Sequence, residues 1–426
     1  MTQAPRHPLH YRDFQFYWLA RLTAMLGHNA MVMALGWAVY DVARSSYGVR
    51  AAALRLGLVG LAQFLPFLIC NPLAGLAADR HDRRKVVRGA LIGQLCFLVP
   101  LCLLAARGGL SLMVLYIVAA GFAAARAFYM PAMNALLSAT VPPEALPRAI
   151  ALGAIAGREE GILGPVLGGY AYAVSPGAAF GFAAVLVALS LAAQILISAD
   201  AAHSRGSPGG PLELMREGLA YVRSNRLLFG TITLDMFATL LGGVTALLPV
   251  YARDILHVGP DGLGLLRAAS SVGALGTALF VSWRPVGDHV GAKMLGSVGI
   301  YGVFTVVFGL STSFWLSAGC LALLGAADMV SVLIRQTLMQ LSTPDDMRGR
   351  VGAISTLFVS ASNELGEMES GLAAALMGPV GAAVFGGVAS IVIAAGWARL
   401  FPVLLGAHGF ENRPFERRPP ESQSPV

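Results

Sequence analysis

Charge is scarce in this chain of 426 residues, in which Asp, Glu, Lys and Arg together make up only 12%. A soluble globular domain carries about 25% charged residues, so the chain lacks the polar surface that a water-soluble fold of this length needs. Lysine is almost absent, since Lys85 and Lys293 are the only lysines among 30 basic residues. Hydrophobic residues reach 56%, and this composition predicts a membrane protein with many spans.

Sequence signals of several other protein classes are also missing. The net charge of +7 does not indicate nucleic-acid binding, because the basic residues lie in short segments between apolar runs. No phosphate-binding G-x-x-x-x-G-K-[ST] loop occurs, which argues against an ATP-driven pump. The four cysteines lack metal-ligand spacing, so neither a metal nor a cofactor is predicted. No hydrophilic stretch is long enough for an enzyme module, so no enzymatic activity is predicted.

What the chain does contain is a series of apolar runs, each long enough to cross a bilayer at about 20 residues. They predict an all-α membrane protein with twelve transmembrane helices in two bundles of six. The predicted spans are 14–40, 52–78, 86–106, 110–135, 149–173, 178–198, 226–251, 262–283, 292–312, 315–341, 351–376 and 380–403.

A hydrophilic stretch divides these spans six and six. The predicted organisation is an N-terminal bundle at 1–198, a linker at 199–225, a C-terminal bundle at 226–405 and a disordered tail at 406–426. The linker begins with flexible Ser-, Gly- and Pro-rich sequence. Its second part has apolar residues at helical spacing and charges opposite, which predicts an amphipathic helix at the membrane surface.

The distribution of Arg and Lys predicts the orientation in the membrane. Only Arg44, Arg50, Arg107 and Arg253 fall in the loops on one side, whereas the other side and both terminal segments hold many basic residues. Cytoplasmic loops carry the excess of positive charge. Both termini and the linker are therefore predicted to be cytoplasmic.

Short matches between the two halves indicate an internal repeat. Arg148 and Arg350 correspond, and at the same offset Gly164 and Gly169 match Gly366 and Gly371. Parallel repeats of six spans are typical of two-bundle secondary transporters.

The loop between the second and third spans carries the most specific motif. It fits G-x-x-x-D-R-x-x-R-R, and its residues are Gly75, Asp79, Arg80, Arg83 and Arg84. In this position the motif resembles the loop signature of the major facilitator superfamily, with Asp82 where the family usually has glycine. The resemblance implies the major facilitator fold, a conformational gating role for these residues, and docking of Asp79 near Arg350 when the cytoplasmic side is closed. A plain positive anchor is the alternative.

Placing a charged residue inside a membrane span costs free energy, so each such residue needs a structural or functional explanation. Within the fold that the resemblance implies, the first, fourth, seventh and tenth helices line a central cavity. Arg126 and Asp328 correspond under the repeat and are expected to face each other or the substrate there, with Asp235 on the same wall. Asn29 in the first span is a further candidate for this cavity. Structural ion pairs between helices are the alternative for each charged group.

The fifth span contains Glu159 and Glu160, followed by G-P-x-x-G-G, whose members are Gly164, Pro165, Gly168 and Gly169. This run resembles the antiporter signature of proton-coupled drug exporters, although small residues at such spacing also serve ordinary close packing of helices.

The eleventh span contains Glu364 and Glu367, which share a face at a separation of three residues. Two crowded carboxylates suit a proton carrier. Glu159, Glu160, Glu364 and Glu367 are therefore the candidates for proton coupling.

Over nearly its full length the chain resembles the major facilitator superfamily, and several local runs are similar to its enterobactin-exporter-like and drug:proton antiporter branches. The run Thr343-Pro-Asp-Asp-Met-Arg-Gly-Arg350 and the run Asn363-Glu-Leu-Gly366 carry part of this similarity. The resemblance implies proton-driven export of a small organic molecule, a siderophore or a drug-like compound, across a bacterial inner membrane by a monomer. An importer, a lipid-moving transporter of the same fold, and a sensor or assembly partner without transport remain alternatives.

Overall fold

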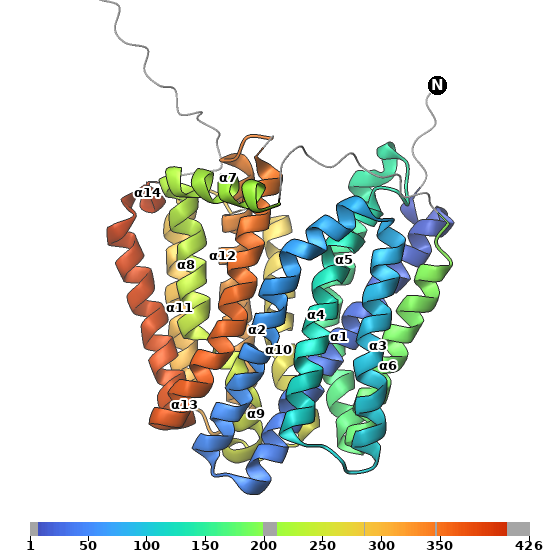
Figure 1. Ribbon diagram of the computed structural model, residues 1–426. Helices are drawn as coiled ribbons and strands as arrows, with labels where there is room; N and C mark the ends of the chain where they lie inside the picture. Colours follow the sequence, from blue (N-terminus) through green and yellow to red (C-terminus); the bar gives the residue numbers. More distant parts are fainter. Residues whose placement is uncertain (1–6, 199–210, 285, 346, 407–426) are drawn as a thin grey trace, which may run out of the picture.

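The computed structural model describes residues 7–198, 211–284, 286–345 and 347–406, without the side chains of residues 79, 151, 154–160, 211, 212 and 214. Every regular element in these ranges is a helix (Figure 1). The first half consists of α1 (Arg12–Ser46), α2 (Val49–Arg80), α3 (Arg83–Ala106), α4 (Leu112–Leu137), α5 (Leu146–Val174) and α6 (Pro176–Ile195). The second half follows the linker helix α7 (Pro211–Ser224) and consists of α8 (Arg226–Gly242), α9 (Leu248–Val250), α10 (Pro260–Trp283), α11 (Val290–Leu310), α12 (Phe314–Leu341), α13 (Arg348–Leu400) and α14 (Pro402–Leu405).

These helices supply the twelve predicted spans. Ten helical segments of the described chain are long and apolar enough to cross a membrane. The 53-residue α13 is two helices joined at Gly378, where φ is 83°. Glycine adopts this left-handed backbone without strain, and Pro379 follows it, so the break falls between the predicted eleventh and twelfth spans. α5 completes the twelve.

The seventh span is less regular than the single predicted helix. α8 ends at Gly242, and the span continues through the 3₁₀ turn η3 (Val244–Leu247), α9 and the π-helical turn η4 (Tyr251–Ile255). Carbonyl groups released by such a break need new donors in a membrane. The Tyr301 hydroxyl donates to the Gly242 carbonyl at 3.0 Å, and the Ser370 hydroxyl donates to the Gly243 carbonyl at 3.1 Å.

The two halves form two bundles that meet through two pairs of helices. Within the first bundle α1 packs against α5 and α6, α2 packs against α4, and α3 packs against α4 and α6. Within the second, α10 packs against α12, α11 packs against α12 and α13, and α8 packs against α13. Between the bundles, α2 packs against α13 and α5 against α10.

The repeat glycines occupy equivalent places in the two bundles. A Cβ added at Gly164 would lie 3.1 Å from the Leu26 carbonyl oxygen in α1, and one at Gly366 would lie 3.0 Å from the Thr239 carbonyl oxygen in α8. Both glycines thus let the fifth helix of a bundle approach the first helix of that bundle closely.

The second glycine pair lies at the contacts between bundles. A Cβ at Gly169 would lie 3.2 Å from the Gly264 Cα in α10, and a Cβ at Gly371 would lie 2.6 Å from the Gly57 Cα in α2. The internal repeat in the sequence therefore has a counterpart in the helix packing of the two bundles.

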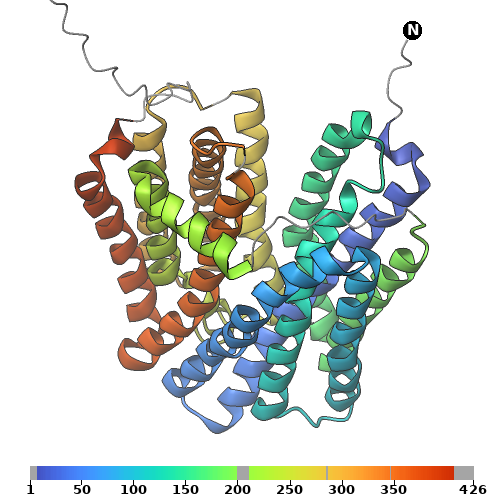
Figure 2. The ribbon, with the colours of Figure 1, turned by 45° about the horizontal axis from the view of Figure 1, so that its top comes forward.

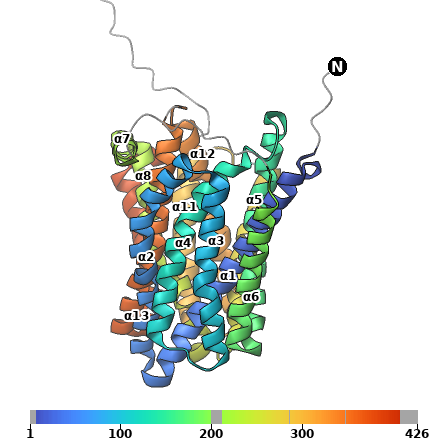
Figure 3. The same ribbon diagram turned by 45° about the vertical axis from the view of Figure 1, so that its right-hand side comes forward.

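The two ends of the molecule differ in charge. The end that is uppermost in Figures 1 and 3 carries α7, the short turn from α2 to α3 and the start of α13, and we call it the basic end. The turns from α1 to α2, from α3 to α4 and from η4 to α10 lie at the opposite end. Large apolar side chains cover the outside, and exposed Trp283 and Trp315 stand near the two ends of the span region, as in the aromatic belts of membrane proteins.

The linker helix α7 packs against the C-terminal bundle. Its apolar residues Met215, Leu219 and Val222 pack against a cluster formed with α8 and α13, and Val222 is only 2% exposed. These apolar side chains of α7 pack on the C-terminal bundle, over which the helix lies in Figure 2, and its position at the membrane surface stays a prediction. A periodic apolar face does not distinguish these two surfaces.

Candidate transport site

A cavity of about 380 Å³ opens in the membrane region of the second bundle. Its walls come from α8, η3, α10, α11, α12 and α13, and the break after Gly242 forms part of its edge. Its polar and charged lining residues are Asp235, Thr239, Thr245, Ser270, Ser297, Tyr301, Asp328, Ser331, Asn363 and Glu367. Pockets of about 300–1,000 Å³ commonly bind small organic ligands.

Two aspartates of this cavity lie in different electrostatic settings. Asp235 of α8 forms an ion pair with Arg335 of α12, and the two side chains are 10% and 7% exposed. Asp328 lies two helical turns before Arg335 on the same face of α12, and its own accessible surface belongs to the cavity. The charges that act on Asp328 are those of Asp235 and Arg335.

Of the two residues expected to face each other or the substrate, Asp328 lines the cavity, whereas Arg126 is not among its lining residues. Asp328 interacts within its own bundle, whereas the Arg126 charge of α4 acts on Glu364 of α13 and on His28 of α1. The internal repeat places Arg126 and Asp328 at equivalent heights in the two bundles, but their side chains interact with different neighbouring residues.

A charged network crosses the interface between the bundles beside this cavity. Glu364 and Glu367 lie one turn apart on α13, and each acts electrostatically on the other. Arg126 of the first bundle acts on Glu364, and Arg267 of α10 acts on Glu367. Glu367 also lines the cavity, so the network reaches the space where a substrate would lie.

The place of this network is set by close helix packing. A Cβ at Gly60 of α2 would lie 2.7 Å from the Glu367 Cβ, and one at Gly36 of α1 would lie 3.6 Å from Arg267 Nη2. Both glycines belong to the first bundle, whereas Glu367 and Arg267 belong to the second. A relative movement of the bundles therefore changes the surroundings of these charges directly.

Other predicted site residues have different places. Asn29 lies at the contact of α1 with α5, next to Gly164, and its amide donates to the Met25 carbonyl at 3.1 Å. Asn29 is not among the residues that line the described cavity. Glu159 and Glu160 lie in α5, and their side chains fall outside the described part of the structure.

The G-P-x-x-G-G run packs α5 on two sides. Gly164 and Gly168 face α1, where a Cβ at Gly168 would lie 2.9 Å from the Ala30 Cα. Gly169 and the Pro165 carbonyl face α10, and a Cβ at Gly264 would lie 2.5 Å from that carbonyl oxygen. The run thus serves close packing within the first bundle and also between the bundles.

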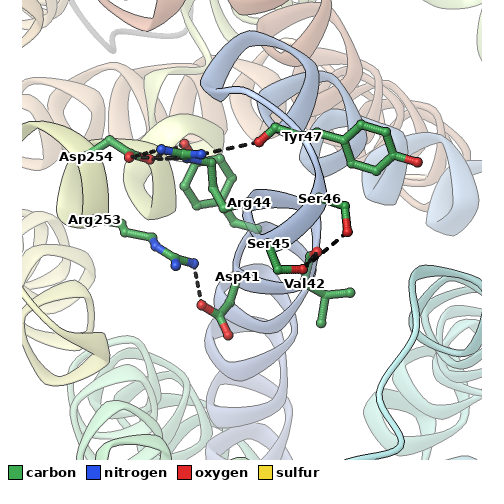
Figure 4. Close-up of polar contacts among 9 residues, drawn as sticks. Asp41, Val42, Arg44, Ser45, Ser46, Tyr47, Arg253 and Asp254 are labelled. Carbon is green, nitrogen blue, oxygen red and sulfur yellow. Dashed lines mark hydrogen bonds and ion pairs between the residues drawn. The ribbon is translucent and has the colours of Figure 1, made fainter.

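Ion pairs between the bundles close the end opposite the basic end. Asp254 in η4 accepts hydrogen bonds from Arg44 of α1, with Arg44 Nη2 at 3.0 Å from Asp254 Oδ1, and from the Tyr40 hydroxyl. Arg253 in turn pairs with Asp41 of α1 (Figure 4). We call these five residues the outer clasp.

Sequence reasoning missed the outer clasp, because it treated Arg44 and Arg253 only as charges that indicate topology. The sequence offers one signal for this region, since Val39-Tyr40 and Val250-Tyr251 are matching runs in the two halves.

The residues with a predicted gating role lie at the basic end. Asp82 caps α3 by accepting from the Arg84 amide at 3.0 Å, which explains an aspartate where the loop motif usually has glycine. Burial raises the pKa of Asp82, but hydrogen bonds from Arg84 and the charges of Arg84 and Lys85 lower the pKa below its ordinary value overall. Arg83 donates to the Ala135 carbonyl of α4 at 3.0 Å, and Arg80 is exposed.

The partner of Arg350 in this structure comes from the linker helix. Arg350 Nη1 lies 2.7 Å from Glu217 Oε2 of α7. The side chain of Asp79 falls outside the described part of the structure, so its docking near Arg350 stays a prediction.

Glycines of the interface helices show which end is closed. A Cβ at Gly57 would lie 2.7 Å from the Gly371 Cα, but Gly75 on α2 and Gly352 on α13 have open space around them. The bundles are therefore in close contact toward the outer clasp and more loosely packed toward the basic end, where the ribbons stand apart in Figure 2.

We expect Asp79→Asn to insert and fold normally but to keep the basic end open for longer. A carboxylate at a helix N-terminus contributes about 0.3–1 kcal/mol when exposed and up to about 2 kcal/mol when partly buried. Since about 1.4 kcal/mol corresponds to a tenfold change, the open population should rise several-fold. The labelling rate of a single cysteine at Gly276, where a side chain has open space, measures this. An unchanged rate with normal transport would reduce Asp79 to a simple loop charge.

The protein has two pseudo-equivalent bundles, a polar cavity at membrane depth and ion pairs that close one end. Together these features define a secondary transporter. The family model described as Major Facilitator Superfamily matches residues 17–367. The chain belongs to the major facilitator superfamily.

Curated relatives cover almost the whole chain. The chain is 29% identical over 419 residues to the enterobactin exporter EntS of Citrobacter koseri, covering 96% of this chain and 94% of that protein. It is 28% identical over 420 residues to the enterobactin exporter EntS of Shigella boydii, with the same coverage.

Solved structures show the same fold. A bacterial homologue of the iron transporter ferroportin in an inward-facing state has a TM-score of 0.66 at 18% identity, covering 91% of this chain and 98% of that one. A POT family transporter in complex with 5-aminolevulinic acid has a TM-score of 0.70 at 11% identity, covering 92% and 96%. The prediction of an all-α, twelve-span major facilitator fold is confirmed, and the protein is a membrane-spanning transporter of small molecules.

Proposed function

We propose that this protein exports a small organic molecule from the cytoplasm in exchange for protons, by alternating access of its cavity to the two sides of the membrane. The observation that carries the proposal is the network of Arg126, Glu364, Glu367 and Arg267, which joins the bundles and reaches the cavity wall.

The network offers a physical route to coupling. Two carboxylates one turn apart repel each other when both are ionised, and a nearby guanidinium offsets this repulsion. Arg126 belongs to one bundle and the glutamates to the other, so rocking of the bundles changes how well their charges are compensated. Proton uptake and release thereby depend on the conformation. Glu159 and Glu160 remain further candidates for this role.

The proposed direction of transport and the proposed substrate class rest on the curated relatives. Proteins named enterobactin exporter match nearly the full length, and they support export of a siderophore or a drug-like compound. The same relatives support a bacterial inner membrane as the location, and we propose that the protein works there as a monomer.

The charge asymmetry between the ends supports cytoplasmic termini. A reporter that is active only outside the cytoplasm should give no signal when fused after Val426, and a strong signal when inserted between Gly108 and Gly109 in the turn after α3. A strong signal from the C-terminal fusion would contradict this orientation.

Transport in everted membrane vesicles tests the function. Vesicles that contain the protein should accumulate labelled enterobactin or the cationic dye ethidium when respiration makes their interior acidic, and a protonophore should abolish accumulation. Uptake of these compounds by right-side-out vesicles alone would indicate an importer. If the folded protein moves neither compound in either preparation, proton-driven export of these classes is wrong.

A further inference from the structure

We propose that the cavity of the second bundle binds an organic cation, with the positive charge of the ligand held at Asp328 and its apolar body held against α11 and α12. This inference names the substrate class of the proposed transport function, and it rests on that function for its physiological role.

The first argument is the unmatched charge of Asp328. Asp235 has an ion pair with Arg335, and Glu367 has the charge of Arg267 beside it. Asp328 accepts no hydrogen bond from the described part of the chain, and the guanidinium that acts on it is the one already paired with Asp235. A carboxylate that lines a cavity at membrane depth without a cation of its own is costly, so a positively charged ligand would complete the site.

The second argument is where this carboxylate points. Asp328 is exposed, and its exposed surface lines the cavity inside the bundle. The ligand charge would therefore meet Asp328 inside a space of about 380 Å³ and away from bulk water, where charge pairs are screened less than at the surface.

The third argument is the rest of the lining. Ala238, Val298, Leu321 and Leu324 provide apolar surface, and Tyr301 provides an aromatic ring. A ring of this kind attracts cations, and the Tyr301 hydroxyl is already engaged with the Gly242 carbonyl. An anionic ligand would instead meet the unmatched charge of Asp328 in the same space, and like charges repel. The lining therefore favours an apolar body that carries an amine or a quaternary nitrogen.

Binding of two dyes with related ring systems and opposite charge tests this inference. Pyronin Y is a xanthene cation and fluorescein is a xanthene anion at neutral pH. Fluorescence anisotropy with the purified full chain should show binding of pyronin Y at least about tenfold tighter than binding of fluorescein. Equal binding, tighter binding of fluorescein, or binding of neither dye would overturn the inference.

Substitutions then locate the site. Asp328→Asn keeps the shape and removes the charge, and it should weaken pyronin Y binding by about 10- to 100-fold, the range for a hydrogen bond to a charged group. Asp328→Glu should retain binding, and so should the matched control Asp288→Asn in the exposed turn between α10 and α11. Unchanged pyronin Y binding in Asp328→Asn would overturn the inference.

A second variant covers the case in which Asp328→Asn fails to fold. Thr239→Lys adds a flexible cation to the cavity wall from α8 and should also abolish pyronin Y binding. These assays need neither a membrane nor a proton gradient. Loss of proton-driven transport with cation-selective binding intact would contradict the proposed function alone, and proton-driven export without cation preference would contradict this inference alone.

Discussion

Asp254→Asn should open the outer clasp and shift the transporter toward the state that is open at the end opposite the basic end. The substitution removes the charge that holds Arg44 and the Tyr40 hydroxyl, and the Asp254 side chain is only 19% exposed. Hydrogen bonds to charged groups contribute about 1.5–3 kcal/mol each, so the population should change by about tenfold or more. Distances between spin labels at Arg107 and Ser313, in the turns of the two bundles at that end, should lengthen.

The second pair of the clasp provides a graded control. Asp41 and Arg253 are more exposed, at 47% and 34%, and solvent weakens such pairs. Asp41→Asn should therefore lengthen the same label distance in a smaller fraction of molecules. If the distance distribution of Asp254→Asn matches that of the unchanged protein, the clasp does not stabilise the closed end.

Glu367→Gln should reduce proton-driven accumulation in everted vesicles to the level of vesicles without the protein. The variant keeps the size of the side chain but removes its charge and its titration, and it leaves Arg267 without its carboxylate. Leaving one of two opposite charges uncompensated inside a protein is destabilising, so the amount of folded protein has to be measured beside transport. The double variant with Arg267→Gln removes the unpaired charge and should recover folding but not transport.

A matched control lies on the same helix. Glu369 is two residues further along, about 200° around α13 from Glu367, and it is not among the residues that line the described cavity. Glu369→Gln should keep most of the transport. Full proton-dependent transport by Glu367→Gln would remove Glu367 from the coupling mechanism and leave Glu364, Glu159 and Glu160 as candidates.

The span architecture could be predicted from the sequence because hydrocarbon thickness fixes the length of each apolar run. The break at Gly378 also follows from local chemistry, since Gly-Pro favours a turn. The break after Gly242 was not predicted, because the run remains apolar through it and its freed carbonyl groups are bound by Tyr301 and Ser370 from distant segments.

The interaction partners of side chains were harder to predict than the positions of the helices. The repeat correctly identified glycines that let helices approach, because a missing side chain acts through the backbone position alone. It did not predict the neighbours of Arg126 and Asp328, because a charged side chain can interact with several adjacent helices. The outer clasp joins residues about 210 positions apart, and no local pattern contains that information.

The exchange of protons for substrate is the central claim, and a pH-sensitive dye in everted vesicles tests it most directly. Once respiration has acidified the interior, addition of ethidium or enterobactin should raise the internal pH as protons leave in exchange. The rise should be absent in vesicles with Glu367→Gln. Accumulation of either compound by the unchanged protein without any rise in internal pH would contradict the account.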